Sequence, residues 1–235
     1  MTSFSTLLSQ KQPQVAVVIT DQEKNNDLIE RGINILEIRV DLFKNLDLKF
    51  IQENVHHRKK TKIPLLLSIR NDIAEGAQSN NTISDQLKFE IFQTLISDID
   101  AVDIELSSKI ISDVMKVAKE HHKGIIISSH NFNKTPKADD LEKIFTDAKQ
   151  YGDIIKIAAQ ANTLDDVATL AAFTIKHKDG NLITMSLGPI GTISRISFPA
   201  LGSLLTYSFI GQPFAPGQIS LYKLKEHLKT YYPLT

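Results

Sequence analysis

The stretch Ile154-Ile155-Lys156-Ile157-Ala158-Ala159 is an apolar run that a single lysine interrupts. Apolar runs without polar alternation are typical of parallel strands that are covered on both faces. A buried ammonium is costly to desolvate, so Lys156 should either pair with a carboxylate or lose its proton easily and act as a nucleophile. The alternative is a lysine at the strand end that extends its ammonium into water.

Similar apolar runs alternate along the chain with segments of helical periodicity. Strands are expected at 15–20, 35–39, 65–69, 102–105, 124–128, 154–157, 182–185 and 204–209. Helices are expected at 21–31, 47–58, 84–97, 108–121, 137–150, 164–176, 193–201 and 221–231. In 235 residues this alternation predicts an α/β fold, a (β/α)8 TIM barrel in one domain, 1–235, although one doubly wound sheet stays open. We expect the segment before Gln12, which fits neither pattern, to cap the bottom of the barrel.

Composition limits the class of protein. The 27 basic and 27 acidic residues give a net charge of zero, so nothing favours nucleic acid or an anionic membrane as partner. The absence of cysteine excludes disulfides, a thiolate nucleophile and a cysteine-based metal site. No apolar run approaches the roughly 18 residues of a membrane span, so we expect a soluble, cytoplasmic protein. The segment 188–191 matches neither a P-loop nor a dinucleotide fingerprint, so no nucleotide cofactor is expected.

Unusual polar residues fall at the carboxyl ends of the expected strands, which in a (β/α)8 barrel meet at one mouth where active sites are built. Glu37 and Arg39 stand two residues apart and therefore point to the same side of their strand. A layer of structural ion pairs would be one explanation, but the number of adjacent strands that contribute favours an active site. The complete set is Glu37, Arg39, Arg70, Asp103, Glu105, His130, Lys156 and Ser186.

His130 follows an apolar run and precedes a turn, so it should stand at the end of the fifth strand. A general base there, opposite a desolvated lysine, would form a sensible catalytic pair with Lys156.

Six motifs now follow one another in a recognisable order. They are Glu37-Ile-Arg39-Val-Asp41, Arg70 with Glu75-Gly76, Asp103-Ile-Glu105, the segment 128–136 around His130, Ile155-Lys156-Ile157, and Ser194-Arg195 with Ala215-Pro-Gly217-Gln218. Together they resemble the type I 3-dehydroquinate dehydratase (3-dehydroquinase) family over nearly the whole chain.

The resemblance implies a (β/α)8 barrel, commonly a homodimer, that acts as a lyase in the shikimate pathway of chorismate and aromatic amino acid biosynthesis. It implies dehydration of 3-dehydroquinate to 3-dehydroshikimate without a metal or an organic cofactor. Lys156 matches the lysine that forms a Schiff base with the C3 ketone. His130 matches the histidine that removes a C2 proton and then protonates the departing C1 hydroxyl in a syn elimination. Glu105 matches the carboxylate that orients this histidine.

The resemblance also implies a set of substrate-binding residues. Arg195 and Gln218 match positions that hold the substrate carboxylate and nearby hydroxyls, which suits a guanidinium fork. Two departures stand out: one extra residue precedes Glu75, and Phe214 stands where the family often has a serine. The substrate-binding residues are expected to be Glu37, Arg39, Arg70, Asp103, Met185, Arg195 and Gln218.

Two other functions remain open. A different Schiff-base barrel enzyme, such as a class I aldolase, would also need Lys156, but a phosphorylated substrate would require a glycine-rich phosphate site after the last strands. A non-catalytic binding protein could use the same barrel, because a fold alone does not determine an activity.

Overall fold

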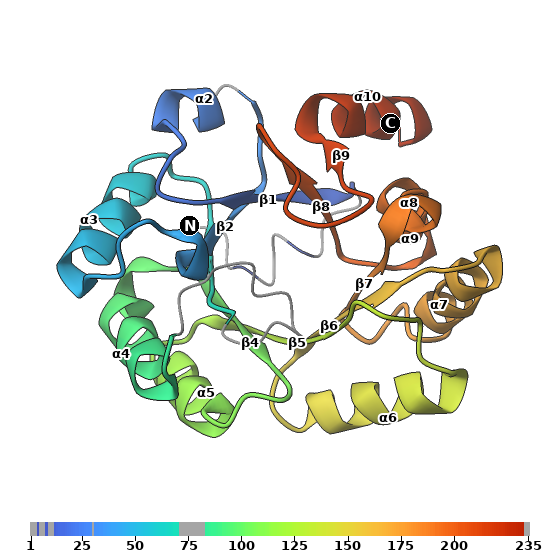
Figure 1. Cartoon of the computed structure of the whole chain (residues 1–235), viewed down its shortest axis with the longest axis horizontal. Helices are drawn as coiled ribbons and strands as arrows, with labels where there is room; N and C mark the ends of the chain where they lie inside the picture. Colours follow the sequence, from blue (N-terminus) through green and yellow to red (C-terminus); the bar gives the residue numbers. More distant parts are fainter. Residues whose placement is uncertain (1–3, 5–7, 9–11, 30, 71–82, 233–235) are drawn as a thin grey trace.

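The computed structural model of the protein describes residues 4, 8, 12–29, 31–70 and 83–232. Its strands are all parallel and curl into a ring, in the order β7-β6-β5-β4-β3-β2-β1-β8-β9 (Figure 1). Where β7 and β8 begin, the backbone N–H of Leu204 donates to the carbonyl of Leu182 at 2.9 Å. The strands are β1 (Gln14–Ile19), β2 (Ile35–Arg39), β3 (Leu65–Ser68), β4 (Ala101–Glu105), β5 (Gly124–Asn131), β6 (Ile154–Gln160), β7 (Leu182–Leu187), β8 (Leu205–Phe209) and β9 (Ile219–Ser220).

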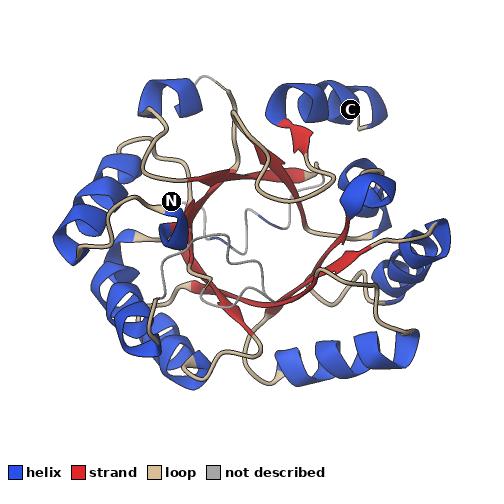
Figure 2. Ribbon diagram, in the orientation of Figure 1, coloured by secondary structure: helices blue, strands red, loops and turns tan. Residues whose placement is uncertain are grey.

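Helices surround this ring on the outside (Figure 2). They are α2 (Asn25–Ile29), η1 (Val40–Leu42), α3 (Leu48–Lys59), α4 (Asp85–Leu95), η3 (Ile96–Asp98), α5 (Ile111–Glu120), α6 (Ala138–Lys149), α7 (Leu164–Lys176), α8 (Gly188–Gly191), α9 (Ser194–Leu201) and α10 (Leu221–Tyr231). The (β/α)8 barrel is therefore confirmed, and the doubly wound sheet is wrong. Among the residues that the structure describes, no helix combines the length and apolar character needed to traverse a bilayer.

The helices begin where the sequence provides caps. Thr163 and Asp166 form a capping box at the start of α7, and the side chain of Ser84 accepts from the backbone N–H of Leu87 at the start of α4. The sequence predicts α7 and α10 with the bounds that the structure has. It predicts one helix between β7 and β8, where the chain forms α8 and α9 with the turn residues between them.

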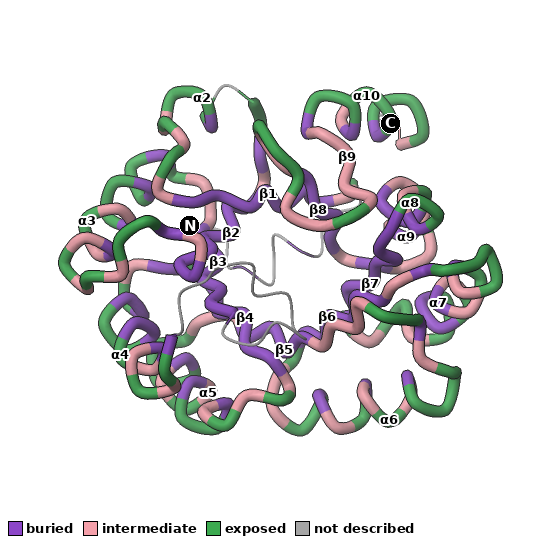
Figure 3. Tube along the Cα trace, in the orientation of Figure 1, coloured by how far each residue is buried: buried purple, intermediate pink, exposed green. Residues whose placement is uncertain are grey.

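Strand parity decides which side chains enter the barrel. On β2, Ile35 belongs to an inner apolar cluster, whereas Leu36 and Ile38 belong to the larger cluster between the sheet and the helices. The strands are accordingly buried on both faces while the outer faces of the helices are exposed (Figure 3). Glu37 and Arg39 share the parity of Ile35 and therefore point inward. The same parity places inward Arg70, Asp103, Glu105, His130, Lys156 and Met185.

Two strands continue beyond their expected ends, β6 to Gln160 instead of Ile157 and β7 to Leu187 instead of Met185, so Lys156 lies further from the strand end than expected and Ser186 lies within its strand. Lys156 is the third residue of β6 and pairs in register with Ser128 and Ile183, so it lies inside the barrel below the mouth. Ser186 has the outward parity, and its backbone N–H donates to Ser194 Oγ of α9 at 2.9 Å. Short apolar runs reveal where a strand begins better than where it ends, because β5 and β6 continue through polar residues.

The opening segment contributes two described residues, Phe4 and Leu8, and both are buried in the inner cluster. A Cβ atom added at Gly124, the first residue of β5, would come within 2.8 Å of the Phe4 ring. Phe4 therefore packs at the end of the barrel where the strands begin, as expected for a bottom cap. The rest of the segment before Gln12 lies outside the described residues.

Phe4→Ala should lower the free energy of unfolding by about 3 kcal/mol, because it leaves a cavity beneath the barrel. Urea denaturation followed by circular dichroism measures the change. Tyr231→Ala, at a ring that is 64% exposed, is the control and should have little effect. A loss below about 0.5 kcal/mol for Phe4→Ala would show that the segment does not act as a cap.

Candidate active site

A pocket opens among the inward-facing residues of the strands and the loop between β8 and β9. Its wall includes Val18 of β1 and Tyr207 of β8, as well as Phe132, which follows β5. Asp103 and Glu105 are buried among the same strands. The predicted site residues that line the pocket are Glu37, Arg39, Arg70, His130, Lys156, Met185, Arg195 and Gln218.

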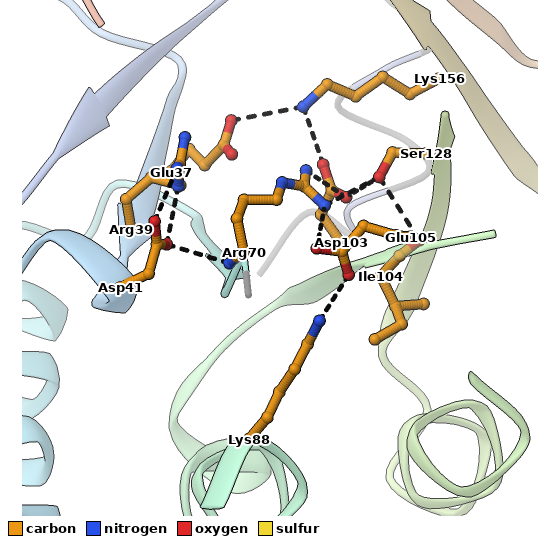
Figure 4. A network of polar contacts seen from close by, with 10 residues as sticks. All are labelled: Glu37, Arg39, Asp41, Arg70, Lys88, Asp103, Ile104, Glu105, Ser128 and Lys156. Carbon is orange, nitrogen blue, oxygen red and sulfur yellow. Dashed lines mark hydrogen bonds and ion pairs between the residues drawn. The ribbon is translucent and has the colours of Figure 1, made fainter. Parts of the chain in front are cut away.

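Lys156 is paired inside this pocket. Its Nζ donates to Asp103 Oδ2 at 2.8 Å and lies 3.7 Å from Glu37 Oε2 (Figure 4). The ammonium also lies 4.3 Å from the centroid of the Tyr207 ring, a cation–π contact that the sequence did not suggest. With 4% of its surface exposed, Lys156 does not reach water at a strand end, so that alternative is wrong.

Asp103 holds two cations at once. Its Oδ1 accepts from Arg70 Nη2 at 2.7 Å and from Ser128 Oγ at 2.6 Å, while Oδ2 accepts from Lys156. Burial alone would raise the pKa of Asp103, but the charges of Arg70 and Lys156 outweigh it and hold the pKa below its ordinary value. Asp103 is therefore a carboxylate under neutral conditions.

Arg39 and Asp41 hold the chain where it leaves β3. Arg39 Nε and Nη2 donate to the two carboxylate oxygens of Asp41 at 2.9 and 2.7 Å, and Asp41 also accepts from the backbone N–H of Arg70 at 3.1 Å. Burial would lower the pKa of Arg39, but the charge of Asp41 and its hydrogen bonds raise it. This bidentate pair orients Arg70 toward the interior.

His130 contributes a neutral imidazole to the pocket. Its ring is nearly parallel to that of Phe132, with an interplanar angle of 13° and 6.1 Å between centroids. Burial, followed by the positive charges of Arg70 and Lys156, lowers the pKa of His130 well below its ordinary value. A neutral ring can accept a proton, which is the first requirement of a general base.

Glu105 contacts a residue that sequence reasoning missed. Lys88 Nζ of α4 donates to Glu105 Oε2 at 2.6 Å, and Arg70 Nη1 lies 3.5 Å from Glu105 Oε1. The role of Glu105 in orienting His130 stays a prediction, since these two cations make the contacts that place the carboxylate.

A helical signal for Lys88 was nevertheless present in the sequence. Lys88 lies three, four and seven residues before Ile91, Phe92 and Leu95, the buried stripe of α4. A lysine on the apolar face of a helix, like a lysine in an apolar strand, is expected to be buried and therefore to need a charged partner or a function. It therefore could have been identified by the argument applied to Lys156.

Arg195 of α9 brings an unpaired cation to the other side of the pocket. Its Nη1 lies 3.1 Å from the sulfur of Met185, and Nε and Nη2 have no hydrogen-bond partner within the described residues. Burial lowers the pKa of Arg195 to about 10, so the guanidinium keeps its charge near neutral pH. Buried open donors on a charged group fit a carboxylate or another anion.

The loop between β8 and β9 closes one side of the pocket. Gln218 Oε1 accepts from the backbone N–H groups of Phe214 and Ala215 at 2.7 and 3.2 Å, so the amide NH2 is the group of Gln218 that can bind a ligand. Gly217 has φ of +77°, and a Cβ atom there would lie 2.2 Å from the carbonyl oxygen of Gly188. Phe214 packs against the inner apolar cluster and lines the pocket. Glu75, in contrast, lies outside the described residues.

Comparisons with known proteins agree on one family. A family model described as type I 3-dehydroquinase matches residues 15–235. The 3-dehydroquinate dehydratase of Hydrogenobaculum sp. (strain Y04AAS1) is 36% identical over 221 residues, which cover 93% of this chain and 99% of the relative.

Solved structures show the same likeness. The crystal structure of the 3-dehydroquinate dehydratase from Aquifex aeolicus VF5 superposes with a TM-score of 0.84 at 33% identity and covers 94% of this chain and 100% of its own. The type I 3-dehydroquinate dehydratase from Clostridium difficile, solved with covalently modified comenic acid, has a TM-score of 0.82 at 28% identity and covers 94% of this chain and 93% of its own.

Asp103→Asn should lower the free energy of unfolding at pH 7 by about 3 to 5 kcal/mol, because two buried cations lose their shared carboxylate. The pKa of Asp103 is lowered in the folded state, so its contribution is complete above about 3.9, the unfolded value, and is lost as the pH falls below it. Urea denaturation at a series of pH values should show the gap between wild type and variant narrowing in acid.

The control is Asp113→Asn, an exposed carboxylate on α5. It should differ little from the wild type at any of these pH values. A gap for Asp103→Asn that stayed constant from pH 7 to pH 3 would contradict the assignment of Asp103 as a paired carboxylate.

Proposed function

The chain belongs to the type I 3-dehydroquinase family, and on this premise we propose that it dehydrates 3-dehydroquinate to 3-dehydroshikimate through a Schiff base on Lys156. The observation that carries the proposal is that one pocket holds both the buried amine of Lys156 and the guanidinium of Arg195, whose Nε and Nη2 lack a hydrogen-bond partner among the described residues. 3-Dehydroquinate has a ketone for the first group and a carboxylate for the second.

The covalent step begins with the neutral amine of Lys156. Its nitrogen attacks the C3 carbonyl carbon, the oxygen takes up a proton, and the resulting carbinolamine loses water to give a protonated imine. This cation stays beside Asp103 and Glu37, which already face the ammonium. The carboxylates are therefore in place before the charge forms on the intermediate. The Clostridium difficile relative was solved with covalently modified comenic acid, and a covalent ligand in a member of the family supports a covalent step in the proposed route.

The elimination uses His130 twice. As a base, its neutral imidazole removes a proton from C2, and the electron pair moves into the C2–C3 bond to give an enamine. As an acid, it returns the proton to the C1 hydroxyl, which departs as water while the imine forms again. Water then hydrolyses the imine and frees Lys156, so the sequence removes one water from the substrate. One histidine serves both steps when the two groups lie on the same face of the ring, which gives a syn elimination.

The other residues bind and orient the substrate in this proposal. Arg195 and the amide NH2 of Gln218 hold the carboxylate and a neighbouring hydroxyl. Met185 packs against the ring, and Phe214 adds apolar surface where a serine would have offered a hydroxyl. Glu37, Arg39 and Arg70 form a further part of the pocket wall, and Asp103, buried among the same strands, contacts Arg70 and Lys156.

Glu105 acts on His130 through Arg70 in this proposal. The Arg70 charge is the first electrostatic cause, after burial, of the lowered pKa of His130. Glu105 lies 3.5 Å from that guanidinium, so it influences both the position and the field of Arg70.

We further propose that the protein is one domain, 1–235, that forms a homodimer in the cytoplasm and works in the shikimate pathway without a metal or an organic cofactor. These points are supported by the resemblance to the family. Sedimentation of the purified protein tests the dimer, and assay after exhaustive dialysis against a chelator tests the independence from metal.

Borohydride reduction in the presence of 3-dehydroquinate should add one ligand to the protein, and a peptide map should place it on Lys156. Lys156→Met, which keeps the volume of the side chain, should abolish the adduct and lower turnover by orders of magnitude. Lys149→Met, an exposed lysine of α6, is the control. An adduct on another lysine, or turnover without any adduct, would refute the proposed route.

The variant His130→Ala should distinguish the role of His130 as the base from that of Lys156 as the nucleophile. It should still give the reduced adduct at Lys156, because imine formation does not need the C2 proton to leave. Turnover measured by the absorbance of the conjugated product should fall by about 10³-fold or more. His121→Ala, an exposed histidine at the end of α5, should behave as the wild type. Turnover of His130→Ala near the wild-type rate would exclude the histidine as proton carrier.

A further inference from the structure

Lys88 is a cation in an unfavourable place. It lies in the first turn of α4, where the helix dipole disfavours positive charge, and its side chain has no exposed surface. Burial lowers the pKa of Lys88 even though the charge of Glu105 opposes the shift. An apolar residue at this position would continue the buried stripe of Ile91, Phe92 and Leu95.

Stability alone does not explain this lysine. Replacing a buried ion pair by well-packed apolar residues is often neutral or stabilising, because the two charges need not be desolvated. The contact at 2.6 Å between Lys88 and Glu105 should therefore have another consequence for the site.

The contacts that connect Glu105 with Lys156 indicate what this consequence is. Glu105 lies 3.5 Å from Arg70, which donates to Asp103 at 2.7 Å, and Asp103 accepts from Lys156 at 2.8 Å. Figure 4 shows these side chains one after another, from Lys88 on its helix to Lys156. We call Lys88, Glu105, Arg70, Asp103 and Lys156 the charge row, in which positive and negative groups alternate.

We propose that Lys88 is a positioning residue that makes the amine of Lys156 available for attack. Lys88 pairs with Glu105, and Arg70 therefore stays hydrogen-bonded to Asp103. The negative charge of Asp103 is then shared between Arg70 and Lys156. Lys156 can then lose its proton more readily than if it alone faced that carboxylate. This inference rests on the proposed function of Lys156 and names a residue that acts through others.

Loss of Lys88 should move Arg70 away from Asp103 and toward Glu105. Glu105 would remain buried with Arg70 as its nearest cation, and Arg70 would close the gap of 3.5 Å. Arg70 would then leave Asp103, whose charge would act mainly on Lys156 and keep it protonated.

Other groups face Lys156 as well. They are Glu37 of β2, the Tyr207 ring of β8, and His130 of β5, whose pKa is lowered by the charge of Lys156. Glu37 favours the ammonium in the wild type and in the variant alike. The difference between the two proteins therefore comes from the position of Arg70.

The test compares Lys88→Met, Lys88→Arg and the matched control Lys49→Met, an exposed lysine in the first turn of α3. In Lys88→Met, kcat should fall about tenfold with KM changed less than about twofold, because Arg195 still binds the carboxylate. The acid side of the kcat profile should move about one pH unit upward. Lys88→Arg should restore most of the rate, and Lys49→Met should match the wild type.

A second measurement needs no substrate. Competitive acetylation with acetic anhydride across pH, read for Lys156 by peptide mass, should show its labelling midpoint about one pH unit higher in Lys88→Met. If the wild type forms no borohydride adduct, the proposed function fails, yet this labelling still tests the link between Lys88 and Lys156. An unmoved midpoint and an unmoved pH profile would overturn the inference.

Glu105→Gln tests the same row should Lys88→Met fail to fold. It preserves the volume of the side chain, and Lys88 can become neutral because burial already favours the loss of its proton. Arg70 would then bind Asp103 without a competitor, so the labelling midpoint of Lys156 should move to lower pH. A shift to higher pH, or none, would also overturn the inference.

Discussion

Asp103 receives a hydrogen bond from Arg70 on one oxygen and from Lys156 on the other, and the carboxylate itself has no exposed surface. A buried carboxylate between two cations determines how the rest of the barrel interior can be filled. Each neighbouring charge must have its own partner, because desolvated groups lose the screening that water provides. Apolar residues of the inner cluster, among them Val18, Met185 and Tyr207, line the pocket together with the charged residues. Strand parity directs both kinds of side chain into the barrel.

The two sides of the pocket differ in their charge balance. Around Lys156 the ammonium is already matched by Asp103 and Glu37, so an iminium can replace it without a new arrangement of the protein. Around Arg195 the guanidinium lacks a partner among the described residues, so an anionic ligand completes the site. In the proposed function, the balanced side accommodates the iminium and the unbalanced side binds the carboxylate of the substrate.

The sequence predicted the barrel and most of its inward-facing polar residues because both follow from local periodicity. Because side chains alternate along a strand, Glu37 and Arg39 were expected on one side of β2, and Asp103 and Glu105 likewise share one side of β4. The apolar run of β6 identified Lys156 as unusual. It did not predict Lys88 or Tyr207, since their roles depend on which helix or strand lies across the barrel. The depth of Lys156 was also missed, because the end of a strand depends on pairing with its neighbours.

The alternation of charges in the charge row has a consequence for how this sequence can diverge. Removing one member of a buried ion pair typically costs about 3 to 5 kcal/mol, a large part of the roughly 5 to 15 kcal/mol that stabilise a domain. Single charge changes along the row should therefore be eliminated by selection, whereas paired changes of adjacent members could survive. Substitutions at Lys88 and Glu105 should consequently occur together among natural variants, and this covariation would extend from the helical shell into the reaction centre.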